Sequence, residues 1–128
     1  MLNESPITTM LPVKDVSRAS EFYAEKLRLH LATTGSDGTC YFEIGHGDAI
    51  GLRPLPGVEP SENTAMSFEV HDIAAEVAEL EGRGVSFQDF EAGEIRTIDH
   101  IATLGDEKAA WFTDSEGNVL CLHEVVAR

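Results

Sequence analysis

Residues 10–23, "MLPVKDVSRASEFY", recur in altered form 57 residues later as "SFEVHDIAAEVAEL", residues 67–80. Each copy begins with a strand-like run and then places an aspartate, Asp15 or Asp72, where a helix N-cap is expected. An amphipathic helix follows in each copy, and Gly82 supplies a stop for the second one. The apolar stripes are Val16, Ala19, Tyr23 and Leu27 in the first helix, and Ile73, Val77 and Leu80 in the second.

A second repeat places "YFEIGHGDAIGLR" (41–53) over "WFTDSEGNVLCLH" (111–123), 70 residues later. The "GHGD" and "SEGN" segments are typical of turns between two alternating strands, so both stretches are predicted hairpins. Each half therefore reads as strand, helix and then several strands. We predict an α+β fold of two βαβββ modules in one domain, with module 1 at about 5–56, a proline-rich link at 53–63 and module 2 at about 64–126.

Alternation along the strands assigns their side chains to two faces. One face is uniformly apolar and should pack on the helices; it holds Leu11, Val13, Phe42, Ile44, Ile50, Leu52, Met66, Phe68, Val70, Phe112, Leu120 and Leu122. The other face is mixed and includes isolated polar groups. A sheet of this kind predicts a curved surface around a ligand cavity, with a solvent-facing or dimer-facing surface as the alternative. The mixed set is Thr8, Met10, Pro12, Tyr41, Glu43, Ala49, Gly51, Arg53, Ala65, Ser67, Glu69, Trp111, Thr113, Val119, Cys121 and His123.

Composition narrows the class of partner. The 128 residues include 23 acidic and 9 basic side chains, for a net charge of −14. Such a chain repels phosphate backbones and anionic membranes, so we expect neither nucleic acid nor membrane as a partner. No apolar run approaches the roughly 20 residues of a membrane span, and the first ten residues lack the pattern of a signal peptide. Cys40 and Cys121 form no recognisable disulfide or zinc motif, which favours a cytoplasmic protein with reduced thiols.

Three stretches carry a resemblance to the vicinal oxygen chelate superfamily, which includes glyoxalase I, extradiol dioxygenases and fosfomycin- and bleomycin-resistance proteins. They are "TTMLPVKDVSRASEFYAEKL", "MSFEVHDIAAEVAELEGRG" and "AAWFTDSEGNVLCLHE". The family's "DPDGN" turn reads "DSEGN" here. The resemblance implies a cupped, incomplete-barrel mixed sheet with helices on its outer face, and a homodimer. It does not decide among the unrelated chemistries that this fold carries.

In metal-dependent members, the resemblance places four ligands on strand positions that here hold Thr8, Gly51, Ala65 and Cys121. Strand alternation independently puts all four on the mixed face. Glycine and alanine have no donor group and threonine is a poor ligand for a divalent ion, so we expect no metal or other cofactor. Cys121 alone is more typical of a small buried apolar residue. A relocated set of Glu43, His46 and His123 is the remaining metal alternative.

The predicted ligand-binding residues are Tyr41, Arg53, Ser67, Trp111, Cys121 and His123. Tyr41 and Trp111 offer flat faces for stacking an aromatic ligand, with core packing as the alternative for Trp111. Arg53 could bind a carboxylate or phenolate, or else pair with Glu43. His123 could hydrogen-bond a ligand or carry a proton, or else pair with Glu69 at the rim.

The segment 90–108, "FEAGEIRTIDHIATLGDEK", has no counterpart of equal length in the first half. We expect a strand together with an excursion over a cavity mouth. Asp99 and His100 there are either lid groups or part of a solvated loop. The sequence contains no Gly-rich phosphate loop, no G-x-S-x-G elbow and no Cys–His nucleophile pattern.

Three functions stay open. The first is a metal-independent binder of a small aromatic or cationic molecule, similar to the sequestering branch of the family. The second is a lyase, isomerase or dioxygenase-like enzyme with His123, Glu43 or Cys121 as non-standard acid–base groups. The third is a metalloenzyme with relocated ligands.

Overall fold

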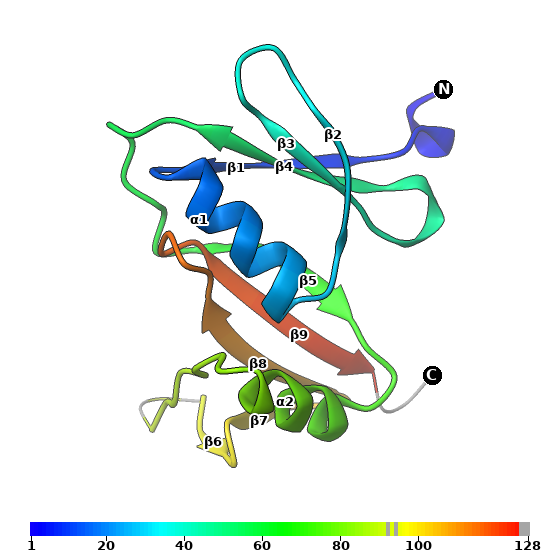
Figure 1. Ribbon diagram of the computed structural model, residues 1–128. Coiled ribbons are helices and arrows are strands. Elements are labelled where there is room, and N and C mark those ends of the chain that lie inside the picture. The colour runs from blue at the N-terminus through cyan, green and yellow to red at the C-terminus, as the bar shows by residue number, and fades with distance from the viewer. Residues whose placement is uncertain (92, 94, 126–128) are drawn as a thin grey trace. The chain divides into compact units, whose positions relative to one another are not determined.

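The computed structural model describes residues 1–91, 93 and 95–125, drawn in Figure 1. The chain forms two compact units, and the second half of the sequence contributes to both. The first unit contains residues 1–60 together with the short segment 114–118, and the second contains residues 61–113 and the chain from Val119 onward. The end of the predicted second module, residue 126, lies outside the described residues. No helix within the described ranges is long and apolar enough to cross a membrane.

The first unit is a four-stranded mixed sheet with one helix. Its strand order is β1-β4-β3-β2, with β1 and β4 parallel and the other neighbours antiparallel. The parallel pair requires a crossover, which the helix supplies. The elements are β1 (Thr8–Val13), α1 (Val16–Glu21), a π-helical turn η2 (Phe22–Lys26), β2 (His30–Thr34), β3 (Cys40–Glu43) and β4 (Ala49–Pro54), with 3₁₀ turns η1 (Leu2–Glu4) and η3 (Gly45–Gly47).

Helix α1 begins as predicted, since the Asp15 side chain accepts a hydrogen bond from the Arg18 amide. The helix packs on β4. Ala19 and Tyr23 are completely buried there, which confirms the centre of the predicted stripe. Five of the six apolar strand positions predicted for this unit are buried, namely Leu11, Val13, Phe42, Ile50 and Leu52, whereas Ile44 is only half-buried.

The second unit repeats this arrangement in a five-stranded sheet of order β5-β9-β8-β7-β6, with β5 and β9 parallel. Helix α2 is capped by Asp72, which accepts from the Ala75 amide, and it ends at Gly82 as predicted. The α+β class and the repeated strand–helix–strands order are confirmed. The elements are β5 (Thr64–Glu69), α2 (Ile73–Gly82), β6 (Thr97–Ile98), β7 (Ile101–Leu104), β8 (Glu107–Thr113) and β9 (Val119–Val125).

Two details differ from the sequence expectation. The second unit has an additional short strand, β6, which pairs with β7 across a tight turn at Asp99 and His100, both with positive φ. Such a turn suits the twist of a two-residue hairpin. The apolar set of β5 and the residue after it is only half-buried, whereas the equivalent Leu11 and Val13 of β1 are buried. This set is Met66, Phe68 and Val70.

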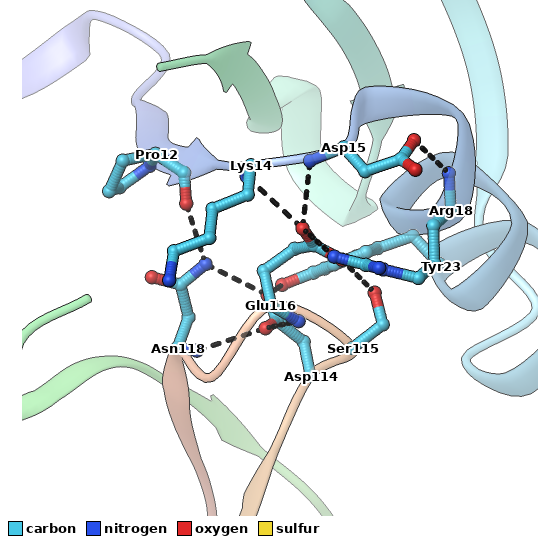
Figure 2. A network of polar contacts seen from close by, with 9 residues as sticks. All are labelled: Pro12, Lys14, Asp15, Arg18, Tyr23, Asp114, Ser115, Glu116 and Asn118. Atoms are coloured by element: carbon cyan, nitrogen blue, oxygen red, sulfur yellow. Dashed lines mark hydrogen bonds and ion pairs between the residues drawn. The ribbon is translucent and has the colours of Figure 1, made fainter. Parts of the chain in front are cut away.

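The turn that joins β8 to β9, residues 114–118, belongs to the first unit, and Figure 2 shows its polar contacts. Glu116 lies where the family's turn has aspartate, and its carboxylate is almost completely buried. It accepts hydrogen bonds from the Arg18 side chain, from the Ser115 hydroxyl and from the amides of Lys14 and Asp15. The Arg18 contact is the largest of the effects that lower the pKa of Glu116, to about 2.

Asp114 organises the other side of the same turn. Its carboxylate accepts from the Tyr23 hydroxyl at 2.7 Å, from the amide of Glu116 at 2.8 Å, and from the amide and side chain of Asn118. Asn118 also donates to the carbonyl of Pro12. Burial, followed by the charge of Asp114, raises the pKa of Tyr23 far above its usual range. The "DSEGN" segment is therefore a set of specific contacts with the end of β1 and with α1.

Candidate ligand-binding faces

Three mixed-face residues lie side by side across the first sheet, and we call them the Gly51 row. Met10 on β1 and Tyr41 on β3 both pair with Gly51 on β4, so all three share a face. A Cβ atom built on Gly51 would lie 2.7 Å from the Met10 Sδ and 3.1 Å from a Tyr41 ring carbon. The two side chains therefore close over the glycine. Met10 is 46% exposed and Tyr41 is half-buried, so both keep surface for a ligand.

The repeat positions of these residues form an equivalent row in the second sheet, which we call the Cys121 row. Ser67 on β5 and Trp111 on β8 both pair with Cys121 on β9. Burial raises the pKa of the Cys121 thiol, and a hydrogen bond with Ser67 partly offsets this effect. Trp111 is half-buried and meets the Phe90 ring edge-on, with centroids 5.4 Å apart. One edge of the indole is thus fixed by packing.

His123 lies beside the Cys121 row and contacts two residues of the neighbouring strand. Its Nδ1 is 2.6 Å from the Ser67 Oγ, and its Nε2 is 3.7 Å from a Glu69 carboxylate oxygen. Ser67 is exposed, while the His123 and Glu69 side chains are 23% and 53% exposed. The pairing of His123 with Glu69 that the sequence left open is present. It leaves the serine hydroxyl and part of the imidazole accessible.

Arg53 and Glu43 do not meet in the way that the sequence left open. Both are exposed, and within the described ranges no ion pair joins them. Hydrogen bonds from Thr39 lower the pKa of Asp37, and the charge of Arg53 adds to this effect. The guanidinium is therefore accessible on the mixed face. Its role as a ligand contact stays a prediction, as does that of Glu43.

The four positions that hold metal in related enzymes do not fit a metal ion here. Thr8 is exposed and pairs with Ala49, whereas the residue beside Gly51 is Met10. The thioether of Met10 occupies the space that a side chain on Gly51 would need. Ala65 lies at an irregularity of the β5–β9 pairing, between Thr64 and Met66. No group of three His, Cys, Asp or Glu side chains in the described part of the chain is placed to hold a metal ion.

The remaining metal alternative drew on residues of both units. Glu43 ends β3, and His46 lies exposed in the 3₁₀ turn after it with a φ of 65°. Both belong to the first unit, whereas His123 belongs to the second.

His100 is held in place by three neighbours in the second unit. Its Nδ1 is 2.9 Å from Asp89 and its Nε2 is 3.0 Å from Glu81, and its ring stacks on Phe87. The hydrogen bond with Asp89 is the largest of the effects that raise the pKa of His100. The excursion predicted at 90–108 thus includes a packed hairpin turn at Asp99 and His100. Two of its residues, Ala92 and Glu94, lie outside the described residues.

Sequence reasoning missed Met10 as a member of the site. The internal repeat could have identified Met10, because Met10 precedes Ser67 by the repeat interval of 57 residues. The close Ser67–His123 contact was also missed. It depends on the register of two strands that are distant in sequence, with Ser67 opposite Cys121 and Glu69 opposite His123.

Comparison with known proteins identifies the family and the fold. The sequence profile of the Glyoxalase/Bleomycin resistance protein/Dioxygenase superfamily matches residues 6–122. A search among curated proteins found no match.

Solved structures share the fold at low identity. A superfamily member from Sphaerobacter thermophilus has 21% identity and a TM-score of 0.75, covering 94% of this chain and 96% of that one. An antibiotic-binding protein from a Streptomyces species has 23% identity and a TM-score of 0.69, covering 94% and 95%. A glyoxalase/bleomycin resistance protein from a Streptomyces species has 26% identity and a TM-score of 0.67, covering 92% and 98%. On the strength of the profile match, this chain belongs to the Glyoxalase/Bleomycin resistance protein/Dioxygenase superfamily.

Proposed function

We propose that this protein binds a small organic molecule on the mixed face of a sheet, without a metal ion. The observation that carries the proposal is the Cys121 row with His123. It places a half-buried indole, an exposed hydroxyl and an accessible imidazole on one face. Ligand sites commonly combine apolar and aromatic walls with a few polar groups of this kind.

Each predicted contact has a distinct chemical role in this proposal. Trp111 in the second unit and Tyr41 in the first each offer a ring face on which an aromatic part of a ligand can stack. In the second unit His123 and Ser67 anchor polar groups beside the apolar surface of Cys121, and in the first unit Arg53 offers a cation for an anionic group. The net charge of −14 favours a ligand that carries positive charge. The structural similarity to an antibiotic-binding protein supports sequestration or resistance as the biological role.

The donor set supports metal independence. Gly51 and Ala65 cannot bind a cation through their side chains, and Met10 lies over Gly51. Elemental analysis of protein purified without chelator tests this part of the proposal. Metal at well below one atom per chain is expected, whereas a stoichiometric divalent ion would overturn it.

Thermal shift measurements test ligand binding itself. Aromatic cationic antibiotics, with metal-free bleomycin as the first probe, should raise the melting temperature of the wild-type protein by mass action. The shift should be lost in Trp111→Ala and kept in His71→Ala, whose exposed side chain lies outside both rows. An equal shift in both variants would exclude the Cys121 row as the binding face.

The second candidate is an enzyme of the lyase or isomerase type, and the contacts of His123 favour it specifically. An imidazole between a hydroxyl and a carboxylate can accept and return a proton. Under this candidate, His123→Ala abolishes turnover while ligand affinity is kept. If the wild-type protein shows no turnover and His123→Ala loses ligand affinity, the enzyme candidate is excluded and only the binding function remains.

We further propose a homodimer, on the basis of family resemblance. Light scattering coupled to gel filtration should give a mass near twice 13.9 kDa. A mass of one chain over a wide range of concentration would contradict this part of the proposal.

A further inference from the structure

Ser67, His123 and Glu69 form a connected set on two neighbouring strands. The Ser67 Oγ lies 2.6 Å from His123 Nδ1, which is short for a hydrogen bond between a hydroxyl and a ring nitrogen. The opposite ring nitrogen faces the Glu69 carboxylate at 3.7 Å. When the serine hydroxyl donates to Nδ1, the imidazole carries its own proton on Nε2, directed toward Glu69. This arrangement is the one in which a histidine can remove a proton from serine.

The repeat shows that the fold itself does not require this set. The positions equivalent to Ser67, Glu69 and His123 in the first half hold Met10, Pro12 and Arg53. None of these can act as a serine nucleophile, as a carboxylate or as a neutral-pH base. The same strands therefore form without the set, so its presence in the second half calls for a chemical explanation.

We propose that Ser67 is a nucleophile that accepts an acyl group from an activated ester, with His123 as its base. The inference rests on the proposed ligand face and adds a reaction to it. The Ser67 oxygen forms a bond to the ester carbonyl carbon as its proton passes to His123 Nδ1. The bond to the leaving alcohol then breaks, and His123 returns the proton to that oxygen. A water molecule next releases the acid by the same steps, so that Ser67 regains its proton.

The neighbouring residues indicate the class of ester. Trp111 pairs with Cys121, the residue opposite Ser67. The indole and the hydroxyl therefore share a face, with strand β9 between their two strands. An aromatic leaving group can stack there, which favours aryl esters. Cys121 is the competing nucleophile, but its side chain is buried whereas Ser67 is exposed. Glu69 acts as a positioning residue, since it faces the ring nitrogen that stays protonated.

The probe for this inference is 4-nitrophenyl acetate. Release of 4-nitrophenolate should be accompanied by one acetyl group on the intact protein, and peptide mapping should place that group on Ser67. Ser67→Ala should remove the adduct, and His123→Ala should slow nitrophenolate release on the order of 10²-fold. Glu69→Gln should shift the pH dependence of the rate. Ser86→Ala, which removes another exposed hydroxyl of the same unit, should react as the wild type does.

An acetyl group on Cys121, on lysine or on the N-terminus alone would overturn the inference, as would a Ser67→Ala variant that reacts at the wild-type rate. Binding of metal-free antibiotic probes, followed in parallel by thermal shift, separates the two proposals. Probe binding without acylation of Ser67 overturns this inference and leaves the proposed function standing. Acylation of Ser67 without probe binding overturns the proposed sequestration and leaves the reaction. Failure of both measurements overturns both proposals.

Discussion

The Arg18 guanidinium binds the Glu116 carboxylate through two hydrogen bonds, from Nε at 2.8 Å and from Nη2 at 2.9 Å, across 98 residues of sequence. Paired contacts of this geometry are stronger and more specific than single ones. The Glu116 side chain is 1% exposed, so its charge depends on these partners. The contact fastens the turn before β9 to helix α1 within the first unit.

The stability of the protein should therefore decrease in acid because of Glu116. Its pKa is about 2 in the folded protein and 4.5 in the reference state. A lowered folded pKa stabilises the protein above the unfolded pKa, and this stabilisation is lost as the pH falls through the window between the two values. Glu116→Gln should cost about 2 kcal/mol at neutral pH, since one neutral amide replaces a charged acceptor.

Urea unfolding at neutral pH and at pH 3 measures this difference. The variant should show a flatter pH dependence than the wild type. The matched control is Glu59→Gln, which alters the exposed pair with Lys14 and should cost less than about 1 kcal/mol. Equal losses in the two variants would contradict the role assigned to Glu116.

Tyr23→Phe should destabilise the protein through one buried hydrogen bond. The Tyr23 hydroxyl donates to Asp114 at 2.7 Å, and the ring is completely buried. Asp114 keeps its contacts with Asn118 and Glu116, so we expect a loss of about 1–2 kcal/mol. Tyr41→Phe is the control, because the Tyr41 hydroxyl forms no hydrogen bond with the described residues and its side chain is only half-buried. Chemical denaturation that gives the same midpoint for both variants would disprove the expectation.

His100 should make the second unit less stable as the pH rises through the pKa of its ring in the folded protein. Contacts with Asp89 and Glu81 raise its pKa, so the stabilisation is complete below the unfolded pKa and is lost as the pH passes the folded one. Proton NMR should show the His100 ring titrating above 6.5, the ordinary value for histidine. His100→Gln should abolish this part of the pH dependence of unfolding, whereas His71→Gln should not. A His100 pKa at or below 6.5 would refute this prediction.

Gly51→Ala tests the close approach in the Gly51 row. The new methyl group would meet the Met10 Sδ and the Tyr41 ring. Because the Met10 side chain is flexible and half-exposed, we expect a loss of only about 1 kcal/mol. The loss should be smaller when measured in a Met10→Ala background, which gives a positive coupling in a double-mutant cycle. Strictly additive losses would show that Met10 does not occupy this space.

Local features of the fold could be predicted from sequence because their causes are local. Asp15 and Asp72 cap their helices, and the stop at Gly82 follows from glycine chemistry. Alternation correctly placed Ile50, Leu52, Leu120 and Leu122 in the core, although Cys121, which it placed on the mixed face, is also buried. The hairpin turn at Asp99 and His100 was less predictable, since two consecutive non-glycine residues rarely adopt positive φ.

The contacts of the candidate site could be predicted only in part. Alternation placed Ser67, Cys121 and His123 on one face, but the 2.6 Å contact depends on the exact register of β5 against β9. The contacts of Glu116 join segments about a hundred residues apart, which no local pattern encodes. The change from "DPDGN" to "DSEGN" in the sequence did not indicate that the Glu116 carboxylate accepts five hydrogen bonds in the described part of the chain.

The most direct test of metal-free ligand binding uses the single tryptophan of the chain, Trp111. Its fluorescence should be followed while a panel of aromatic, cationic antibiotics is titrated into the protein in a chelating buffer. We expect at least one probe to quench the signal to saturation, with equal affinity in chelator and in added divalent metal. Saturation that occurs only after metal is added, with no probe binding in chelator, would contradict the account.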